Sequence, residues 1–125
     1  MLHTTVLVLA KDRFVAALLG ALIELSRRRA VFPRDGEPTT LAMQRARADL
    51  ILLDCALGAP TCRSVAAAAR EAGLRVLMFS AAHTEPETRD IANYYGTDGF
   101  ALPVSPREFA GYLDRALAVE LRANS

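Results

Sequence analysis

The sequence has little excess charge of either sign and very little cysteine. Its 15 Lys and Arg against 14 Asp and Glu side chains leave a net charge of +1 over 125 residues. This balance gives no support for a direct nucleic-acid partner. Two cysteines, Cys55 and Cys62, are too few for a disulfide framework or a four-ligand zinc site. With no secretory signal, we expect a cytoplasmic protein with reduced thiols.

Long hydrophobic runs are also missing. The segment FVAALLGALI, residues 14–23, has no polar side chain, but it is ten residues long and is flanked by Arg13 and Glu24. A membrane span needs about 20 apolar residues, so we predict a buried helix and no membrane anchor. The seven glycines are scattered and form no phosphate-binding loop, and no His or acid cluster indicates a metal site.

What the sequence does contain is an alternation of short aliphatic runs with helical patterns. Apolar residues make up 52% of the chain, enough for a buried core, and its length suits one domain. The aliphatic runs predict strands at residues 6–9, 29–32, 50–53, 76–79 and 100–102. The helical spacings, with their capping residues, predict helices at 12–25, 39–47, 61–72, 84–95 and from 105 onward.

Three of these strands, at 6–9, 50–53 and 76–79, are unbroken aliphatic runs. Such runs are typical of parallel strands covered on both faces, which predicts a doubly wound α/β sheet. We expect residues 1–125 to form one domain with no separate output domain. Ligands of such sheets bind at the carboxyl ends of the strands. The residues that follow strands, and so should meet at that edge, are Ala10, Lys11, Asp54 and Ser80.

The order of elements and several short motifs resemble the receiver domain of bacterial response regulators. The motifs are the strand-ending Asp54, the Phe79-Ser80-Ala81 turn and the segment from Gly99 to Pro103. The resemblance covers nearly the whole chain and implies a flavodoxin-like fold with strand order 2-1-3-4-5. It also implies that Asp54 occupies the position where a histidine kinase places a phosphoryl group, with Ser80 as the hydroxyl residue that senses it.

Three positions depart from the receiver pattern. Receivers hold Mg²⁺ with two adjacent acids after the first strand, where this chain has Ala10 and Lys11. Asp12 follows, and we expect it to cap the next helix. The receiver lysine before the proline of the fifth strand corresponds to Leu102, before Pro103. Mg²⁺ requires oxygen ligands, so we expect no metal and no Mg²⁺ cofactor.

The lysine at position 11 suggests a replacement for the metal. A carboxylate in a partly buried pocket needs a partner. We therefore hypothesise an ion pair between the Lys11 ammonium and the Asp54 carboxylate.

Two surfaces are candidate interfaces. We expect Val15, Leu18, Leu19 and Leu22 to face the sheet. The opposite face of this helix then points outward and consists of small residues: Ala16, Ala17, Gly20 and Ala21. It is either an ordinary apolar patch or a contact surface for a partner or a second copy. The resemblance implies a second interface near the last strand, because receivers commonly dimerise there. Its candidate residues are Tyr94, Tyr95 and Tyr112.

The sequence favours a stand-alone, receiver-like signalling domain that is not an enzyme. We expect it to act by protein–protein contact, with a histidine kinase or another signalling protein as partner or as a homodimer, and independently of Mg²⁺-dependent phosphorylation. One alternative is a single-domain response regulator phosphorylated on Asp54. Another is a small α/β enzyme or ligand-binding module, which is disfavoured because no nucleophile–base pair of the required kind is evident.

Overall fold

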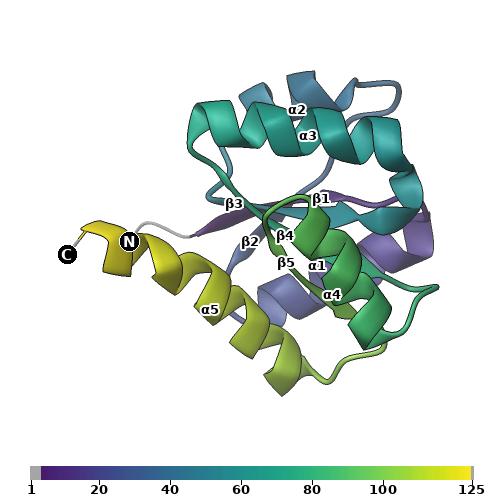
Figure 1. Cartoon of the computed structure of the whole chain (residues 1–125), viewed down its shortest axis with the longest axis vertical. Helices are drawn as coiled ribbons and strands as arrows, with labels where there is room; N and C mark the ends of the chain where they lie inside the picture. Colours follow the sequence, from purple (N-terminus) through teal and green to yellow (C-terminus); the bar gives the residue numbers. More distant parts are fainter. Residues whose placement is uncertain (1–3, 125) are drawn as a thin grey trace.

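A five-stranded parallel sheet with strand order β2-β1-β3-β4-β5 organises the molecule (Figure 1). The computed structural model describes residues 4–124, with side chains described through residue 118. The strands are β1 (Thr5–Leu9), β2 (Arg29–Val31), β3 (Leu50–Asp54), β4 (Arg75–Ser80) and β5 (Asp98–Ala101). The helices are α1 (Arg13–Leu25), α2 (Thr39–Ala46), α3 (Ala59–Ala72), α4 (Glu85–Tyr94) and α5 (Pro106–Asn124), with a short turn η1 (Cys55–Leu57) after β3. The predicted flavodoxin-like fold and its strand order are confirmed.

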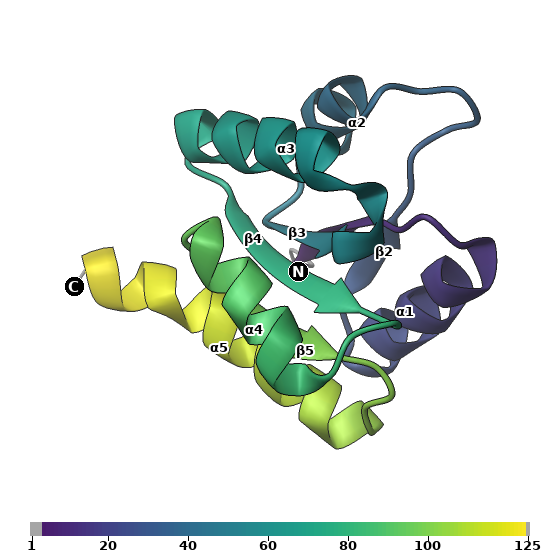
Figure 2. The ribbon, with the colours of Figure 1, turned by 45° about the vertical axis from the view of Figure 1, so that its right-hand side comes forward.

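Helices cover both faces of the sheet, which explains the unbroken aliphatic strands. In β3, Leu50 and Leu52 pack with residues of α1 and α5. Ile51 and Leu53 pack on the opposite face, with residues of α2, α3 and α4. Figure 1 shows α2 and α3 above the sheet, and in Figure 2 α4 is drawn in front of part of α5. Every residue of β3 is therefore buried, as expected for a central parallel strand.

Capping residues set the helix ends close to where the sequence placed them. Asp12 Oδ1 accepts hydrogen bonds from the Phe14 and Val15 main-chain N–H groups, so Asp12 caps α1 as predicted. Thr84 and Glu87 form a capping box at α4. The boundaries differ by up to two residues: α3 begins at Ala59 because Pro60 fits its first turn.

The predicted orientation of α1 is wrong in part. Leu18 is 49% exposed, whereas Gly20 is buried and Ala16 is half-buried against the core. The reason is Phe32, which follows β2: a methyl group on Gly20 would lie 2.7 Å from Phe32 Cζ. Glycine lets this ring lie on the helix, which turns position 20 inward. The outward residues form what we call the α1 stripe: Phe14, Ala17, Leu18, Ala21 and Leu25.

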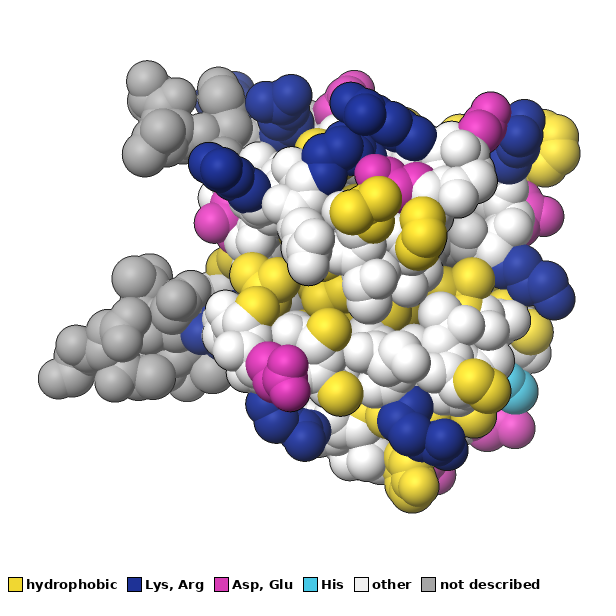
Figure 3. Space-filling model, turned by 90° about the horizontal axis from the view of Figure 1, so that it is seen from above, with side chains coloured by type: hydrophobic (Ala, Val, Ile, Leu, Met, Phe, Trp, Pro, Cys, Tyr) yellow, Lys and Arg dark blue, Asp and Glu magenta, His cyan; other side chains and the backbone are white. Residues whose placement is uncertain are grey.

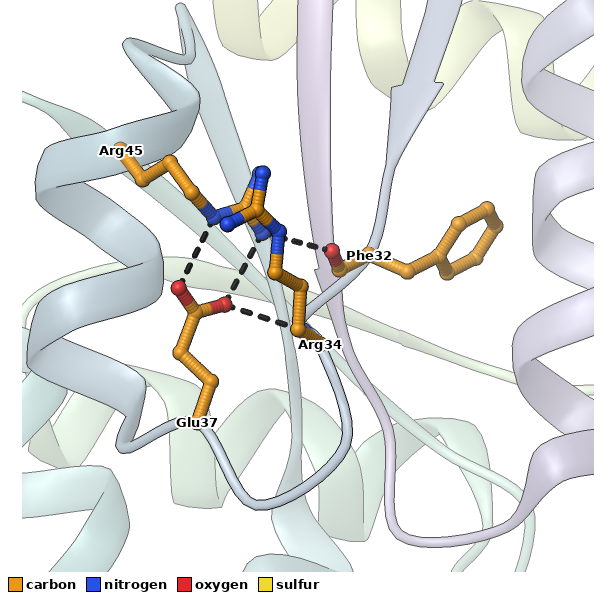
Figure 4. A network of polar contacts seen from close by, with 4 residues as sticks. All are labelled: Phe32, Arg34, Glu37 and Arg45. Atoms are coloured by element: carbon orange, nitrogen blue, oxygen red, sulfur yellow. Dashed lines mark hydrogen bonds and ion pairs between the residues drawn. The ribbon is translucent and has the colours of Figure 1, made fainter.

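A polar network fixes the loop that carries Phe32 (Figure 4). Arg45 of α2 donates from Nε and Nη2 to the two carboxylate oxygens of Glu37, at 2.8 and 2.9 Å, and Nη2 also donates to the Phe32 carbonyl at 3.0 Å. The Arg34 main-chain N–H donates to Glu37 at 3.0 Å. Figure 4 shows the Phe32 ring pointing away from this network, on the side of α1. The network therefore holds the Phe32 main chain while its ring covers Gly20.

The face over α2 and α3 presents apolar and charged side chains together. Figure 3 looks onto this face, where hydrophobic side chains form a broken band across the middle and Lys and Arg side chains lie around it. None of the helices within residues 4–124 is both long and apolar enough to cross a membrane.

Candidate functional site

The candidate site lies at the carboxyl edge of the sheet, where Asp54 ends β3. Leu53 is paired in register with Leu9 of β1, and Asp54 is paired with Phe79 of β4. The residues that follow β1 and those that end β4 therefore flank Asp54. In Figure 2 the arrowhead of β4 lies on the same side of the molecule as the start of α1. This is the arrangement that the parallel strand order dictates.

The Asp54 carboxylate is buried and both of its oxygens are hydrogen-bonded. The side chain is 4% exposed. Oδ2 accepts from the main-chain N–H of Lys11 at 3.0 Å, and Oδ1 accepts from the main-chain N–H of Ala56 at 2.8 Å. One bond crosses from β3 to the loop after β1, and the other closes the turn that follows β3. Asp54 therefore joins two loops of this edge as a structural acceptor.

The predicted ion pair between Lys11 and Asp54 is wrong. Within the described residues, the Lys11 ammonium makes no ion pair with Asp54, and Lys11 is exposed. The two residues are in contact, but through the Lys11 main chain. The physical reason is that two main-chain donors already satisfy the carboxylate, so it needs no buried cation.

The side chains that follow β1 beside Asp54 supply few oxygen ligands of the kind that Mg²⁺ binds. Ala10 has no side-chain oxygen and packs against the core, and Lys11 carries a positive charge. Asp12, the residue after Lys11, has one carboxylate oxygen engaged as the cap of α1. No three His, Cys, Asp or Glu side chains gather as metal ligands within the part of the chain that the structure describes.

Ser80 and Leu102 close the site on the side of β5. Ser80 is 1% exposed, and its Oγ accepts from the main-chain N–H groups of Ala82 and His83, at 3.0 and 2.9 Å. The Leu102 main-chain N–H donates to the Ser80 carbonyl at 2.8 Å. Leu102 packs against the core, and the Leu102–Pro103 peptide is cis. The Ser80 side chain thus organises the loop between β4 and α4.

Two free thiols lie beside Asp54. Cys62 Sγ lies 3.5 Å from the Asp54 carbonyl oxygen and is 2% exposed. Burial raises the pKa of the Cys55 thiol to about 11, with smaller contributions from Cys62 and the Asp54 charge. Burial also raises the pKa of the Cys62 thiol. Both are therefore protonated at neutral pH, as is typical of buried, unreactive thiols.

The three candidate tyrosines lie near one another, at the α4–β5–α5 side. Tyr94 is 75% exposed and meets Tyr95 edge to face, with ring centroids 5.1 Å apart. The Tyr112 ring stacks on Phe100 at 4.8 Å and lies under the Arg115 guanidinium. Tyr95 and Tyr112 also line a groove of about 800 Å³. The groove is lined by residues 75–78 of β4 and by Leu53, and Asp54 is not among its lining residues.

The α1 stripe contains three large exposed residues that the sequence analysis did not place among the interface candidates: Phe14, Leu18 and Leu25. Phe14 is 87% exposed and Leu25 is 69% exposed. A signal was present, because Phe14, Leu18, Ala21 and Leu25 follow one another at spacings of four, three and four. That spacing places them on one side of a helix. It was hidden because every residue from 14 to 23 is apolar, so the periodicity has no polar side to reveal it.

Solved structures of receiver domains and response regulators share this fold. No family model and no curated protein matches the sequence. A response regulator from Thermotoga maritima is 15% identical, with a TM-score of 0.77 over 94% of this chain and 99% of that one. Chemotaxis protein CheY4 from Vibrio cholerae is 21% identical, with a TM-score of 0.72 over 93% and 100%. The signal receiver domain of a modulated diguanylate cyclase from Desulfovibrio desulfuricans is 23% identical, with a TM-score of 0.76 over 97% and 98%. At these identities the likeness establishes the receiver fold.

Proposed function

We propose that this chain is a cytoplasmic, receiver-like signalling domain that works through contacts with other proteins, without Mg²⁺-dependent phosphorylation of Asp54. Its fold supports the signalling role, since response regulators and receiver domains share it. We propose no enzymatic activity for it. Its partner is a protein, such as a histidine kinase or another signalling protein, and its near-neutral charge favours no direct contact with nucleic acid.

One observation carries the proposal: both oxygens of Asp54 are held by main-chain N–H groups, while the Ala10 and Lys11 side chains supply no metal ligand. Phosphoryl transfer relies on a metal ion to neutralise the oxygens between nucleophile and leaving group. Ala10 and Lys11 stand where the receiver resemblance places the two acids. A phosphoryl group added to one oxygen of Asp54 would disturb the hydrogen bond that this oxygen accepts from Lys11 or Ala56, and the side chains of Ala10 and Lys11 would hold no metal ion to neutralise its charge.

The sensing side of the site supports the same conclusion. Ser80 Oγ already accepts two N–H groups of its own loop, so turning toward Asp54 would leave two donors without that acceptor. Leu102 presents an aliphatic side chain where receivers present a lysine. The groups that would report a phosphoryl group in a receiver are here occupied or apolar.

The test is a direct attempt to modify Asp54. The protein is incubated with acetyl phosphate and Mg²⁺ and weighed by mass spectrometry, and amide spectra are recorded with beryllofluoride and Mg²⁺. We expect no added mass and no Mg²⁺-dependent shift of the Lys11 or Ala56 amides. A saturable, Mg²⁺-dependent change that disappears in Asp54→Asn would overturn the proposal.

A matched variant shows that the assay can detect a response. The triple substitution Ala10→Asp/Lys11→Asp/Leu102→Lys returns the three groups that the receiver pattern contains. Since Asp54 and Ser80 are already placed at the strand ends, we expect this variant to gain Mg²⁺-dependent amide shifts that the unmodified chain lacks.

A further inference from the structure

Large apolar side chains that face solvent gather on one helix of this molecule. Six such side chains are exposed among the described residues, and four of them lie on or against α1: Phe14, Leu18, Leu25 and Phe32. Exposed apolar residues that are scattered singly need no explanation, but a contiguous group marks an interaction surface. The α1 stripe is such a group, because its residues follow the spacing of a helix that packs against another helix.

The charges beside the stripe have a definite arrangement. Arg13 and Glu24 are eleven residues apart, which is about three helical turns, so they lie on the same side of α1. They stand almost symmetrically about Leu18, one near each end of the helix. If a second α1 packs antiparallel with its midpoint near Leu18, Arg13 of each copy comes opposite Glu24 of the other.

We propose that two copies of this chain associate through the α1 stripe, with the two helices antiparallel about a twofold axis. This inference rests on the proposed role in protein–protein contact and names the partner as a second copy of the chain. A twofold interface uses the same patch on both copies and must complement itself. The α1 stripe is complementary to itself in charge, because Arg13 of each copy faces Glu24 of the other. It is also complementary in side-chain size.

The size complementarity follows from the same antiparallel alignment. Phe14 of one copy comes level with residue 23 of the second copy, between its Ala21 and Leu25 on the stripe, where the small Ala21 side chain leaves room for the ring. Leu18 lies near the axis and meets the Leu18 and Ala17 region of the second copy. The two small residues allow the helices to approach closely, while Phe14 and Leu25 provide most of the apolar area at the ends.

Three arginines lie at the ends of the stripe. Arg13 has an intramolecular partner, Asp35 at 3.8 Å, but both side chains are at least 92% exposed, and such a pair is worth little. Arg28, beyond the end of α1, is paired with Asp114 at 2.6 Å. Arg27 lies in the turn after the helix, outside the regular α1 positions.

The test is the molar mass in solution by sedimentation equilibrium, from about 5 to about 500 µM. One helix face is a small interface, so we expect a weak dimer that forms within this range. Phe14→Glu and Leu18→Glu should remain monomeric throughout, because each places a charge inside the apolar contact. The matched control is Leu41→Glu: Leu41 lies in the first turn of α2 and is 52% exposed, and its substitution should leave the dimer unchanged.

Charge reversal tests the antiparallel alignment. Arg13→Glu and Glu24→Arg should each weaken the dimer by roughly threefold to tenfold, the scale of two exposed ion pairs. The double variant should recover most of the loss, because the opposite charges again face each other across the axis. Failure of the double variant to recover would overturn the antiparallel arrangement.

Two results would overturn the dimer itself. One is a monomer at every concentration. The other is a dimer that Phe14→Glu leaves intact and Tyr94→Glu abolishes, which would place the contact on the α4–β5–α5 side. Sedimentation involves no phosphoryl donor and no Mg²⁺, so its failure is separate from any result of the phosphorylation test at Asp54.

Discussion

At the scale of single residues, Asp54 acts as an acceptor of main-chain hydrogen bonds. Its two oxygens connect the loop after β1 with the turn after β3, through Lys11 and Ala56. A buried carboxylate that accepts such bonds stabilises the folded state, because hydrogen bonds to a charged group are stronger than those between neutral groups. This gives Asp54 a structural reason to be present without a phosphoryl group.

The structural role of Asp54 predicts a stability cost when it is replaced. Asp54→Ala leaves the Lys11 and Ala56 N–H groups without their acceptor, so the free energy of unfolding should fall by about 1–3 kcal/mol. Asp54→Asn keeps one carbonyl acceptor and should cost less. Urea unfolding at pH 7 measures both, with the fully exposed Asp35 replaced by Ala as a control. A change in Asp54→Ala no larger than that of the control would contradict the role.

At the scale of elements, one ion pair controls how the loop between β2 and α2 meets α1. Glu37 has a side chain only 7% exposed and holds Arg45, which also binds the Phe32 carbonyl. The hydrogen bonds from Arg45, followed by that from the Arg34 main chain, lower the pKa of Glu37 to about 2. The loop therefore keeps its geometry, and the Phe32 ring its place over Gly20, as long as Glu37 is ionised.

A pH dependence follows from this pair. Because folding lowers the pKa of Glu37, its contribution to stability is complete above the unfolded value near 4.5 and is lost as the pH falls toward 2. Arg45→Gln should raise the pKa of Glu37 toward 4.5, measured by carboxyl NMR titration. The stability difference between this variant and the unmodified chain should shrink from pH 5 to pH 2. Arg47→Gln, at an exposed arginine on the turn after α2, should leave Glu37 unchanged; an equal shift in both variants would refute the assignment.

At the scale of the whole molecule, the core is complete but one outer surface is apolar. The two faces of the sheet are covered, by α1 and α5 on one side and by α2, α3 and α4 on the other. The α1 stripe lies outside both core clusters of the monomer. Its contribution to the stability of the molecule therefore depends on whether a second copy covers it.

Dimer formation predicts that thermal stability depends on protein concentration. Anything that binds the folded chain stabilises it by mass action. The Tm should therefore rise by a few degrees between about 5 and about 500 µM, measured by circular dichroism in cells of different path length. Phe14→Glu should show the same Tm at both concentrations. A Tm independent of concentration in the unmodified chain would argue against a folded dimer.

The sequence determined the layered fold, because its strands are aliphatic runs that require cover on both faces, and because Asp12, Thr84 and Ser105 mark helix starts through local capping. It also placed Asp54 and Ser80 at one edge, since parallel strands bring their carboxyl ends together. Those conclusions depend on short-range residue patterns and on the order of elements along the chain, both of which can be read from the sequence.

The tertiary structure decided how α1 is turned and what holds Asp54. Leu18 faces solvent and Gly20 faces inward because Phe32, from another element, lies on the helix. Lys11 contacts Asp54 through its main chain, because the main-chain N–H groups of Lys11 and Ala56 already satisfy both carboxylate oxygens. The orientation of α1 and the contact between Lys11 and Asp54 both depend on how elements distant in sequence pack together. Neither an all-apolar helix nor a single lysine shows that packing in its neighbouring residues.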